Sequence, residues 1–175
     1  MSTVRMAAVA VDSYRGLMGA FPTGVAVVTT VDRKGRPHGL TCTSLASATL
    51  APPTLLVSLS VGSGTGIAVH HSGCFAVNLL HARAREAASV FGSPVPDRFG
   101  RVAWRFSPRV RQPWLFDDAF ALAECVVVDT RLVGDHEVVF GEVVHVEQSV
   151  DVPLLCGLRR FRAWPSDRSS ARRSR

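Results

Sequence analysis

The chain has 175 residues, of which 47% are hydrophobic and 19% are charged. This length predicts one domain that buries on the order of 70% of its unfolded surface, and the composition excludes a disordered protein. The net charge of +6 comes from the end of the chain, because residues 159–175 hold seven arginines against Asp167, whereas residues 1–158 balance 13 basic against 13 acidic side chains. We therefore expect one domain over residues 1–164 and a basic, disordered tail over residues 165–175. A basic nucleic-acid module remains an alternative that would depend on this tail.

The four cysteines, Cys42, Cys74, Cys125 and Cys156, are far apart and form no C-x-x-C pair. This spacing argues against a zinc centre and against a thioredoxin-type redox centre. The first 20 residues contain polar and charged side chains throughout, and the chain has no run of about 18 apolar residues. We expect a reduced, soluble, cytoplasmic protein whose cysteines are small buried side chains, with no metal and no membrane partner.

The first elements in chain order are a short helix and two strands. Residues Val11–Ala20 have a modest helical pattern that ends before Pro22. Residues 25–31 are almost all apolar and rich in β-branched side chains, which predicts a strand buried on both faces. Residues 32–35 end in a glycine and predict a hairpin turn, followed by a second strand over residues 37–43.

A glycine and hydroxyl segment separates the next strand from a second helix. Residues 54–60 alternate in hydropathy and predict a strand, and Gly62–Gly66 leads into a short helix that runs through His70. Glycines and hydroxyls before a helix are the ingredients of an anion site, because unpaired N–H groups and the helix dipole both favour negative charge there. A plain polar loop with an N-cap residue is the alternative.

The remaining pattern predicts a β-rich domain. We expect a strand over residues 75–80, a helix over residues 82–91, an irregular excursion over residues 92–116 that covers a site, and two long strands around residues 119–128 and 138–146. Strands in hairpin order with a few helices favour a mainly β fold, an antiparallel β-barrel with helical decoration. The chain has neither a G-x-G-x-x-G after its first strand nor a G-x-x-x-x-G-K-[ST], which disfavours a doubly wound nucleotide fold.

Short motifs in a fixed order then give a family resemblance. Over roughly residues 14–164 the chain resembles the flavin reductase family, the reductase components of two-component flavin monooxygenases. The motifs are Phe21-Pro-Thr-Gly-Val25, Gly39-Leu-Thr-Cys-Thr-Ser44, Pro52-Pro53, Phe75-Ala-Val-Asn78, Asp97-Arg-Phe99, and Gly134-Asp-His136 with Gly141-Glu-Val143.

The resemblance implies an antiparallel split β-barrel of the FMN-binding type, a homodimer with its flavin near the subunit interface, and NADH or NADPH as hydride donor to FMN or FAD. It also implies a separate flavin-dependent monooxygenase as partner. His136 would contact the pyridine nucleotide as the catalytic residue. The residues implied to bind cofactor are Thr23, Gly24, Thr41, Cys42, Thr43, Ser44, Ser47, Ser58, Leu59, Ser60, Ser63, Thr65, Phe99 and Phe161.

Hydride transfer explains why these residue types are polar but uncharged. The protein has to stack two rings and donate hydrogen bonds where negative charge develops, and it needs no nucleophile. We interpret Cys42 as a small residue of the pocket wall, and His136 has a structural alternative as a histidine at a hairpin end. The alternative function is a flavin-binding carrier or electron-transfer protein without efficient NAD(P)H turnover.

Overall fold

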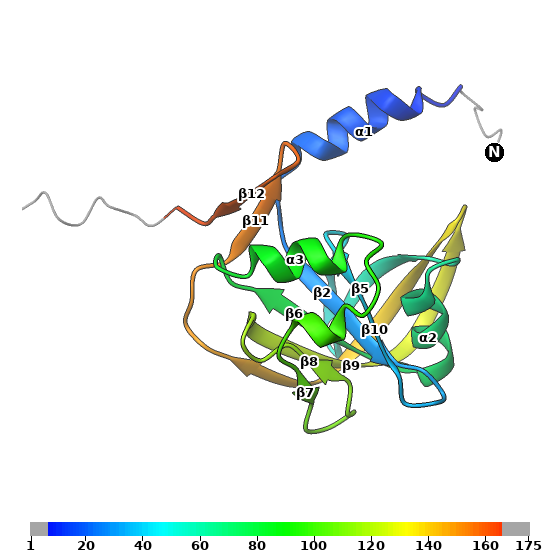
Figure 1. Ribbon diagram of the computed structural model, residues 1–175. Helices are drawn as coiled ribbons and strands as arrows, with labels where there is room; N and C mark the ends of the chain where they lie inside the picture. Colours follow the sequence, from blue (N-terminus) through cyan, green and yellow to red (C-terminus); the bar gives the residue numbers. More distant parts are fainter. Residues whose placement is uncertain (1–6, 166–175) are drawn as a thin grey trace, which may run out of the picture.

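The computed structural model describes residues 7–165, so the predicted basic tail lies outside the described residues except for Pro165. Its main body is a seven-stranded sheet with the strand order β3-β2-β6-β9-β10-β5-β4 (Figure 1). All neighbouring strands run antiparallel, which confirms a mainly β fold, but hairpins join only β2 to β3, β4 to β5 and β9 to β10, and the other neighbouring strands are linked by crossovers. The strands are β2 (Ala26–Val31), β3 (Pro37–Cys42), β4 (Ala46–Leu50), β5 (Pro53–Ser60), β6 (Cys74–Leu80), β9 (Ala119–Val133) and β10 (His136–Gln148).

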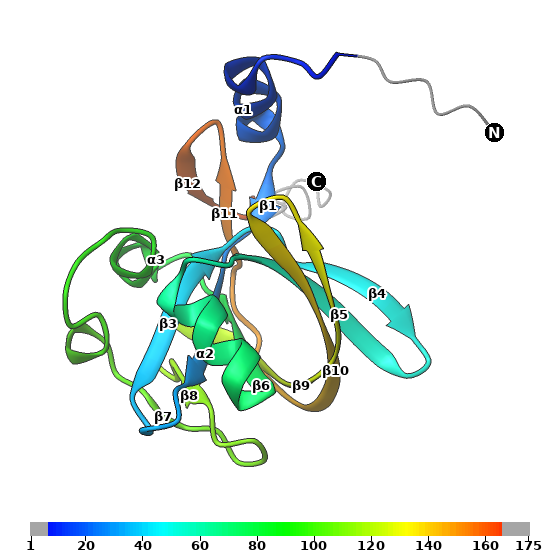
Figure 2. The ribbon, with the colours of Figure 1, turned by 90° about the vertical axis from the view of Figure 1, so that its right-hand side faces the viewer.

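The long hairpin of β9 and β10 bends, and this bend curves the sheet (Figure 2). The register between β9 and β10 shifts after Phe140 and again after Val143, and such bulges increase local twist. As a result β3, at one edge of the strand order, comes near β5, which lies next to the other edge. Helix α2 (Gly64–Ser72) contacts β2, β3 and β5 and so covers the gap between the two ends of the sheet.

The three α-helices follow the sequence pattern with one difference. Helix α1 (Val11–Ala20) has the predicted bounds, buries no residue and projects from the body (Figures 1 and 2). Helix α3 spans Arg85–Phe91, so the prediction of a helix from Ala82 was wrong for its first turn. The amide of Ala82 instead donates to the carbonyl of Val152, a distant partner that the local pattern does not contain. Among the helices of residues 7–165, none is long and apolar enough to span a membrane.

Two small sheets flank the main one. Strand β1 (Thr23–Gly24) pairs with β11 (Leu154–Gly157), which pairs with β12 (Arg160–Ala163). Within the predicted irregular excursion, a 3-10 turn at Phe99–Arg101 precedes a short hairpin of β7 (Arg105–Phe106) and β8 (Pro113–Trp114). The prolines of this segment did not prevent short strand pairing, because few backbone hydrogen bonds are needed.

The core contains two apolar clusters and a few buried polar groups that tie the excursion to the sheet. Strand β2 is almost entirely buried, as its apolar sequence predicted. Asn78 donates to the carbonyl of Val27 and accepts from the amide of Leu115, so it joins β6 to β2 and to the end of the excursion. Glu124 is fully buried on β9, a position that the alternating apolar pattern had not singled out.

Gly141 shows how tightly the sheet is packed. A Cβ at this position would lie 2.5 Å from a ring carbon of Phe75 and 2.9 Å from the Cβ of Cys125, and both residues are fully buried. We therefore expect Gly141→Ala to lower the free energy of unfolding by about 1–3 kcal/mol. Chemical denaturation should show this loss, whereas Gly62→Ala, which meets nothing within 4 Å, should change it by less than about 0.5 kcal/mol. Equal stabilities would contradict the packing described for Gly141.

Candidate functional site

Two neighbouring cavities lie where the curved sheet brings β3 and β5 together. The larger, of about 780 Å³, we call the hydroxyl cavity, and the smaller, of about 530 Å³, the helix-end cavity. Leu40 and Arg98 line both cavities. The hydroxyl cavity contains eight of the predicted site residues, namely Thr41, Cys42, Thr43, Ser44, Ser58, Leu59, Ser60 and His136.

Hydrogen bonds join the hydroxyl-bearing segments of this cavity. The hydroxyl of Ser44 donates to the carbonyl of Ser58 (3.1 Å) and accepts from the amide of Ser58 (3.0 Å). Thr41 donates its hydroxyl to the carbonyl of Ala88 in α3 (2.7 Å), so its oxygen is left only as an acceptor. The side chain of Leu59 is buried in the core, so only its backbone can reach a ligand.

Cys42 forms part of the cavity wall. Its side chain is almost fully buried and its Sγ lies 3.2 Å from the hydroxyl of Ser44. Burial raises the pKa of this thiol, which keeps it protonated and unreactive at neutral pH. This environment agrees with the interpretation of Cys42 as a wall residue rather than a nucleophile.

His136 stands at the rim of the hydroxyl cavity, at the start of β10 and opposite Ser60 in register. Its Nδ1 lies 2.8 Å from Oδ1 of Asp135, and its side chain is 48% exposed. The hydrogen bond with His136 lowers the pKa of the Asp135 carboxyl, so this carboxylate stays charged and orients the ring. A half-exposed imidazole with one nitrogen held in place can present the other nitrogen to a ligand.

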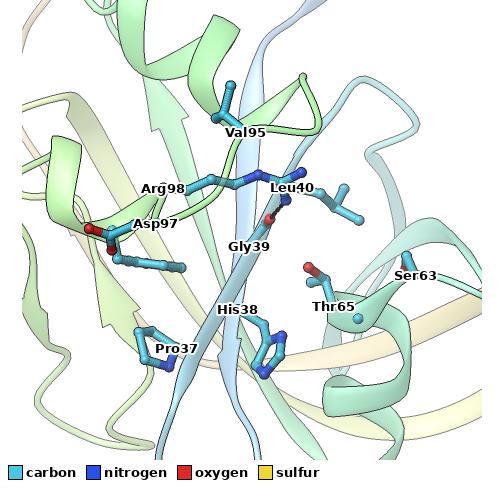
Figure 3. Close-up of a pocket in the computed structure, with 11 residues that line it drawn as sticks. Pro37, His38, Gly39, Leu40, Ser63, Thr65, Val95, Asp97 and Arg98 are labelled. Atoms are coloured by element: carbon cyan, nitrogen blue, oxygen red, sulfur yellow. Dashed lines mark hydrogen bonds between the residues drawn. The ribbon is translucent and has the colours of Figure 1, made fainter.

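The helix-end cavity combines a helix N-terminus with a guanidinium (Figure 3). Ser63 caps α2 by accepting from the amide of Gly66, and Gly64 and Thr65 line the cavity beside it. Across the cavity, Arg98 donates to the carbonyls of Gly39 (2.9 Å) and Ser93 (2.7 Å). Its Nε is buried and has no hydrogen-bond partner among the described residues. These groups make a site suited to an anion.

The structure brings Ser63, Thr65 and Phe99 together in the helix-end cavity, whereas the four remaining predicted residues lie outside both cavities. Thr23 and Gly24 line a third cavity of about 290 Å³, which they share with Thr43. Ser47 is exposed on β4, and Phe161 on β12 packs against one of the core clusters. Within one copy of the chain these four residues do not line the two cavities described above.

Sequence reasoning missed Arg98 and Tyr14, which line the hydroxyl cavity. Arg98 lies inside the Asp97-Arg-Phe99 motif, so the signal was present, although only Phe99 was selected from it. No sequence pattern pointed to Tyr14 as a cavity residue. It lies on α1, a helix that buries none of its residues, so its apolar side chains give no pattern that marks a site. Within residues 7–165 no group of three or more His, Cys, Asp or Glu side chains is placed to hold a metal ion.

Comparison with known proteins agrees with this geometry. The flavin reductase-like domain family matches residues 18–165. A flavin reductase (NADPH) of Lentzea aerocolonigenes is 57% identical over 151 residues, which cover 86% of this chain and 88% of that protein. The reductase subunit HsaB of a Mycobacterium tuberculosis flavin-dependent monooxygenase is 36% identical over 143 residues, which cover 82% of this chain and 73% of that protein.

Solved structures give the same result for the fold. The NADH:FAD oxidoreductase SgcE6 of Streptomyces globisporus, in complex with NAD and FAD fragments, superposes with a TM-score of 0.84 at 30% identity, covering 90% of this chain and 94% of that one. The predicted enzyme class, an NAD(P)H-dependent flavin reductase, is thereby confirmed. The family match over most of the chain, together with a relative identical at more than half of the aligned positions, shows that this chain belongs to the flavin reductase family.

Proposed function

We propose that the protein transfers hydride from NADH or NADPH to FMN or FAD and supplies the reduced flavin to a separate flavin-dependent monooxygenase. The observation that carries this proposal is the hydroxyl cavity, where two hydroxyl-bearing segments and His136 line one space. The role of HsaB as a reductase subunit of a monooxygenase supports a separate oxygenase as partner. The four free cysteines support a reducing, cytoplasmic environment.

The residues of the two cavities fit a flavin. The hydroxyl cavity offers neutral donors and acceptors for a tricyclic ring and a ribityl chain, through Thr41–Ser44 and Ser58–Ser60. The neighbouring helix-end cavity offers the start of α2, with Ser63 and Thr65, and the guanidinium of Arg98 for the flavin phosphate. The guanidinium of Arg98 is held in place by its bonds to the carbonyls of Gly39 and Ser93, so its positive charge is fixed at the wall of this cavity.

When bound between these residues, flavin would supply N5 as the acceptor of hydride from C4 of the nicotinamide. The protein's own contribution is to orient the two rings and to exclude water from between them. Backbone amides and the hydroxyls of Thr43, Ser58 and Ser60 would donate hydrogen bonds to a ring that becomes more negative. His136, held by Asp135, binds the pyridine nucleotide at the rim of the cavity.

We further propose an FMN-binding split barrel that works as a homodimer with the flavin near the subunit interface. The curved antiparallel sheet supports the barrel assignment. Helix α1 buries none of its residues within one copy, and Tyr14 and Leu17 on it and Phe21 just after it are more than half exposed, which supports a second copy as its cover. A second copy would also explain why Thr23, Gly24, Ser47 and Phe161 lie outside the two cavities of a single chain.

One assay tests the proposed activity. NADH and NADPH oxidation should be measured with FMN, FAD and riboflavin, and we expect turnover that requires added flavin. A yellow protein that fails to oxidise either nucleotide in the presence of excess flavin would contradict the proposal and would favour the flavin-carrier alternative.

Removing the imidazole should change the KM for the pyridine nucleotide much more than the KM for flavin. We expect His136→Ala to raise the KM for the pyridine nucleotide on the order of tenfold, with a much smaller change in the KM for flavin, because one hydrogen-bonding contact to the nucleotide is lost. The pKa of Asp135 should rise towards its ordinary value in this variant, because its hydrogen bond to His136 is the main cause of the low value. His145→Ala, on the same strand but outside the hydroxyl cavity, is the control. Unchanged kinetics in both variants would remove His136 from the site.

Neutralising the guanidinium should affect only phosphorylated flavins. We expect Arg98→Gln to raise the KM for FMN by about tenfold and to leave the KM for riboflavin nearly unchanged, because riboflavin has no phosphate to pair with the guanidinium. Arg101→Gln, an exposed arginine three residues away, serves as the matched control. An equal rise for FMN and riboflavin would instead assign Arg98 a purely structural role.

A further inference from the structure

The β7–β8 hairpin is held rigidly against the sheet at the end of the molecule away from α1 (Figures 1 and 2). The fully buried carboxylate of Glu124 accepts hydrogen bonds from the hydroxyl of Ser107 and from the amides of Arg109 and Val110. A buried carboxylate that is this fully satisfied fixes the loop it binds. The side chains that the hairpin carries are therefore preorganised.

A cavity of about 590 Å³ lies between this hairpin and the ends of β9 and β10, and we call it the hairpin cavity. It shares no lining residue with the hydroxyl cavity or the helix-end cavity. Its volume is within the range of small-molecule sites. The flavin and nucleotide roles proposed above leave this cavity without a function.

Arg105 supplies the cation of the hairpin cavity. Its guanidinium lies 4.2 Å from the ring centre of Trp114, its cross-strand partner, and 5.2 Å from that of Phe116. Among the described residues no carboxylate lies within ion-pair distance of Arg105. Stacking occupies the faces of a guanidinium and leaves its N–H edge available for a planar, bidentate acceptor such as a carboxylate.

The other walls define the rest of the ligand. Leu122 pairs in register with Glu147 and so lies on the same face of the sheet, and together with Phe120 it gives the cavity an apolar floor for a ring. Glu147 also lines the cavity, and its Oε1 lies 3.4 Å from Nε2 of His145. A carboxylate in the wall repels a multiply charged anion such as a phosphate, but it accepts a hydrogen bond from a hydroxyl on the ligand.

We propose that the hairpin cavity binds a small aromatic monocarboxylate that carries a hydroxyl group, with its carboxylate on Arg105, its ring on the apolar floor and its hydroxyl towards Glu147. The site has no lining residue in common with the hydroxyl and helix-end cavities and shares only Phe120 with the cavity that Thr23 and Gly24 line. Arg105 and Glu147 together select for one negative charge at one end and a donor at the other.

Titrations followed by NMR test this site on the full-length protein. The probes are 4-hydroxybenzoate, phenol, which lacks the carboxylate, and acetate, which lacks the ring. We expect 4-hydroxybenzoate to shift the Trp114 indole N–H and the Arg105 Nε–H resonances saturably, with a dissociation constant at least about tenfold lower than that of phenol or acetate. Arg105→Gln should weaken binding at Trp114 by about tenfold or more, whereas Arg109→Gln, an exposed arginine of the same loop, should leave it unchanged.

Three outcomes would overturn the proposal. One is the absence of any shift of Trp114 up to about 10 mM 4-hydroxybenzoate, a concentration above any specific affinity. Another is equal binding of phenol and 4-hydroxybenzoate, and the third is equal binding by wild type and Arg105→Gln. A thermal unfolding curve for Arg105→Gln that matches wild type shows that any loss of binding reports on the cavity and not on the fold.

Discussion

Two hydrogen bonds between Ser44 and the backbone of Ser58 fix the hydroxyl-bearing wall of the proposed site. They extend the antiparallel pairing of β4 with β5, in which Ala46 lies opposite Leu56, to the segment that follows β3. The hydroxyl of Ser44 donates to the carbonyl of Ser58 and accepts from its amide, so the two bonds together fix the distance between the two segments. The hydroxyls of Thr41–Ser44 and Ser58–Ser60 thus form one wall instead of two separate edges, and the other features of the site are placed relative to that wall.

Charge is arranged along the site in a way that suits a flavin. The hydroxyl cavity has hydroxyls along much of its wall, together with Arg98 and Asp135, while the helix-end cavity next to it has the N-terminus of α2 and the same arginine. A ring that gains negative charge during reduction needs donors, whereas a phosphate needs a cation and a helix dipole. Arg98 borders both cavities and anchors the loop at Ser93 to β3, so it links the excursion after α3 to the site.

The sequence predicted most of what depends on local pattern. Strand β2 and helix α1 were read correctly because continuous β-branched residues and helical spacing are local signals, and Ser63 was recognised as part of a helix start. Features that depend on distant partners were missed. The amide of Ala82 donates to Val152 instead of starting α3. Glu124 can be buried because the amides of Arg109 and Val110 donate hydrogen bonds to its carboxylate. The order of the motifs predicted Thr41–Ser44 and His136 as site residues. No sequence pattern could show that Thr23 and Phe161 lie outside the two cavities of a single copy.

If the hydroxyl cavity holds the flavin ring, a crystal structure of the protein with FMN will show it there. We expect the isoalloxazine ring between Thr41–Ser44 and Ser58–Ser60, with the phosphate at the start of α2 beside Arg98. A structure in which these side chains fill the hydroxyl cavity and FMN binds elsewhere would contradict it.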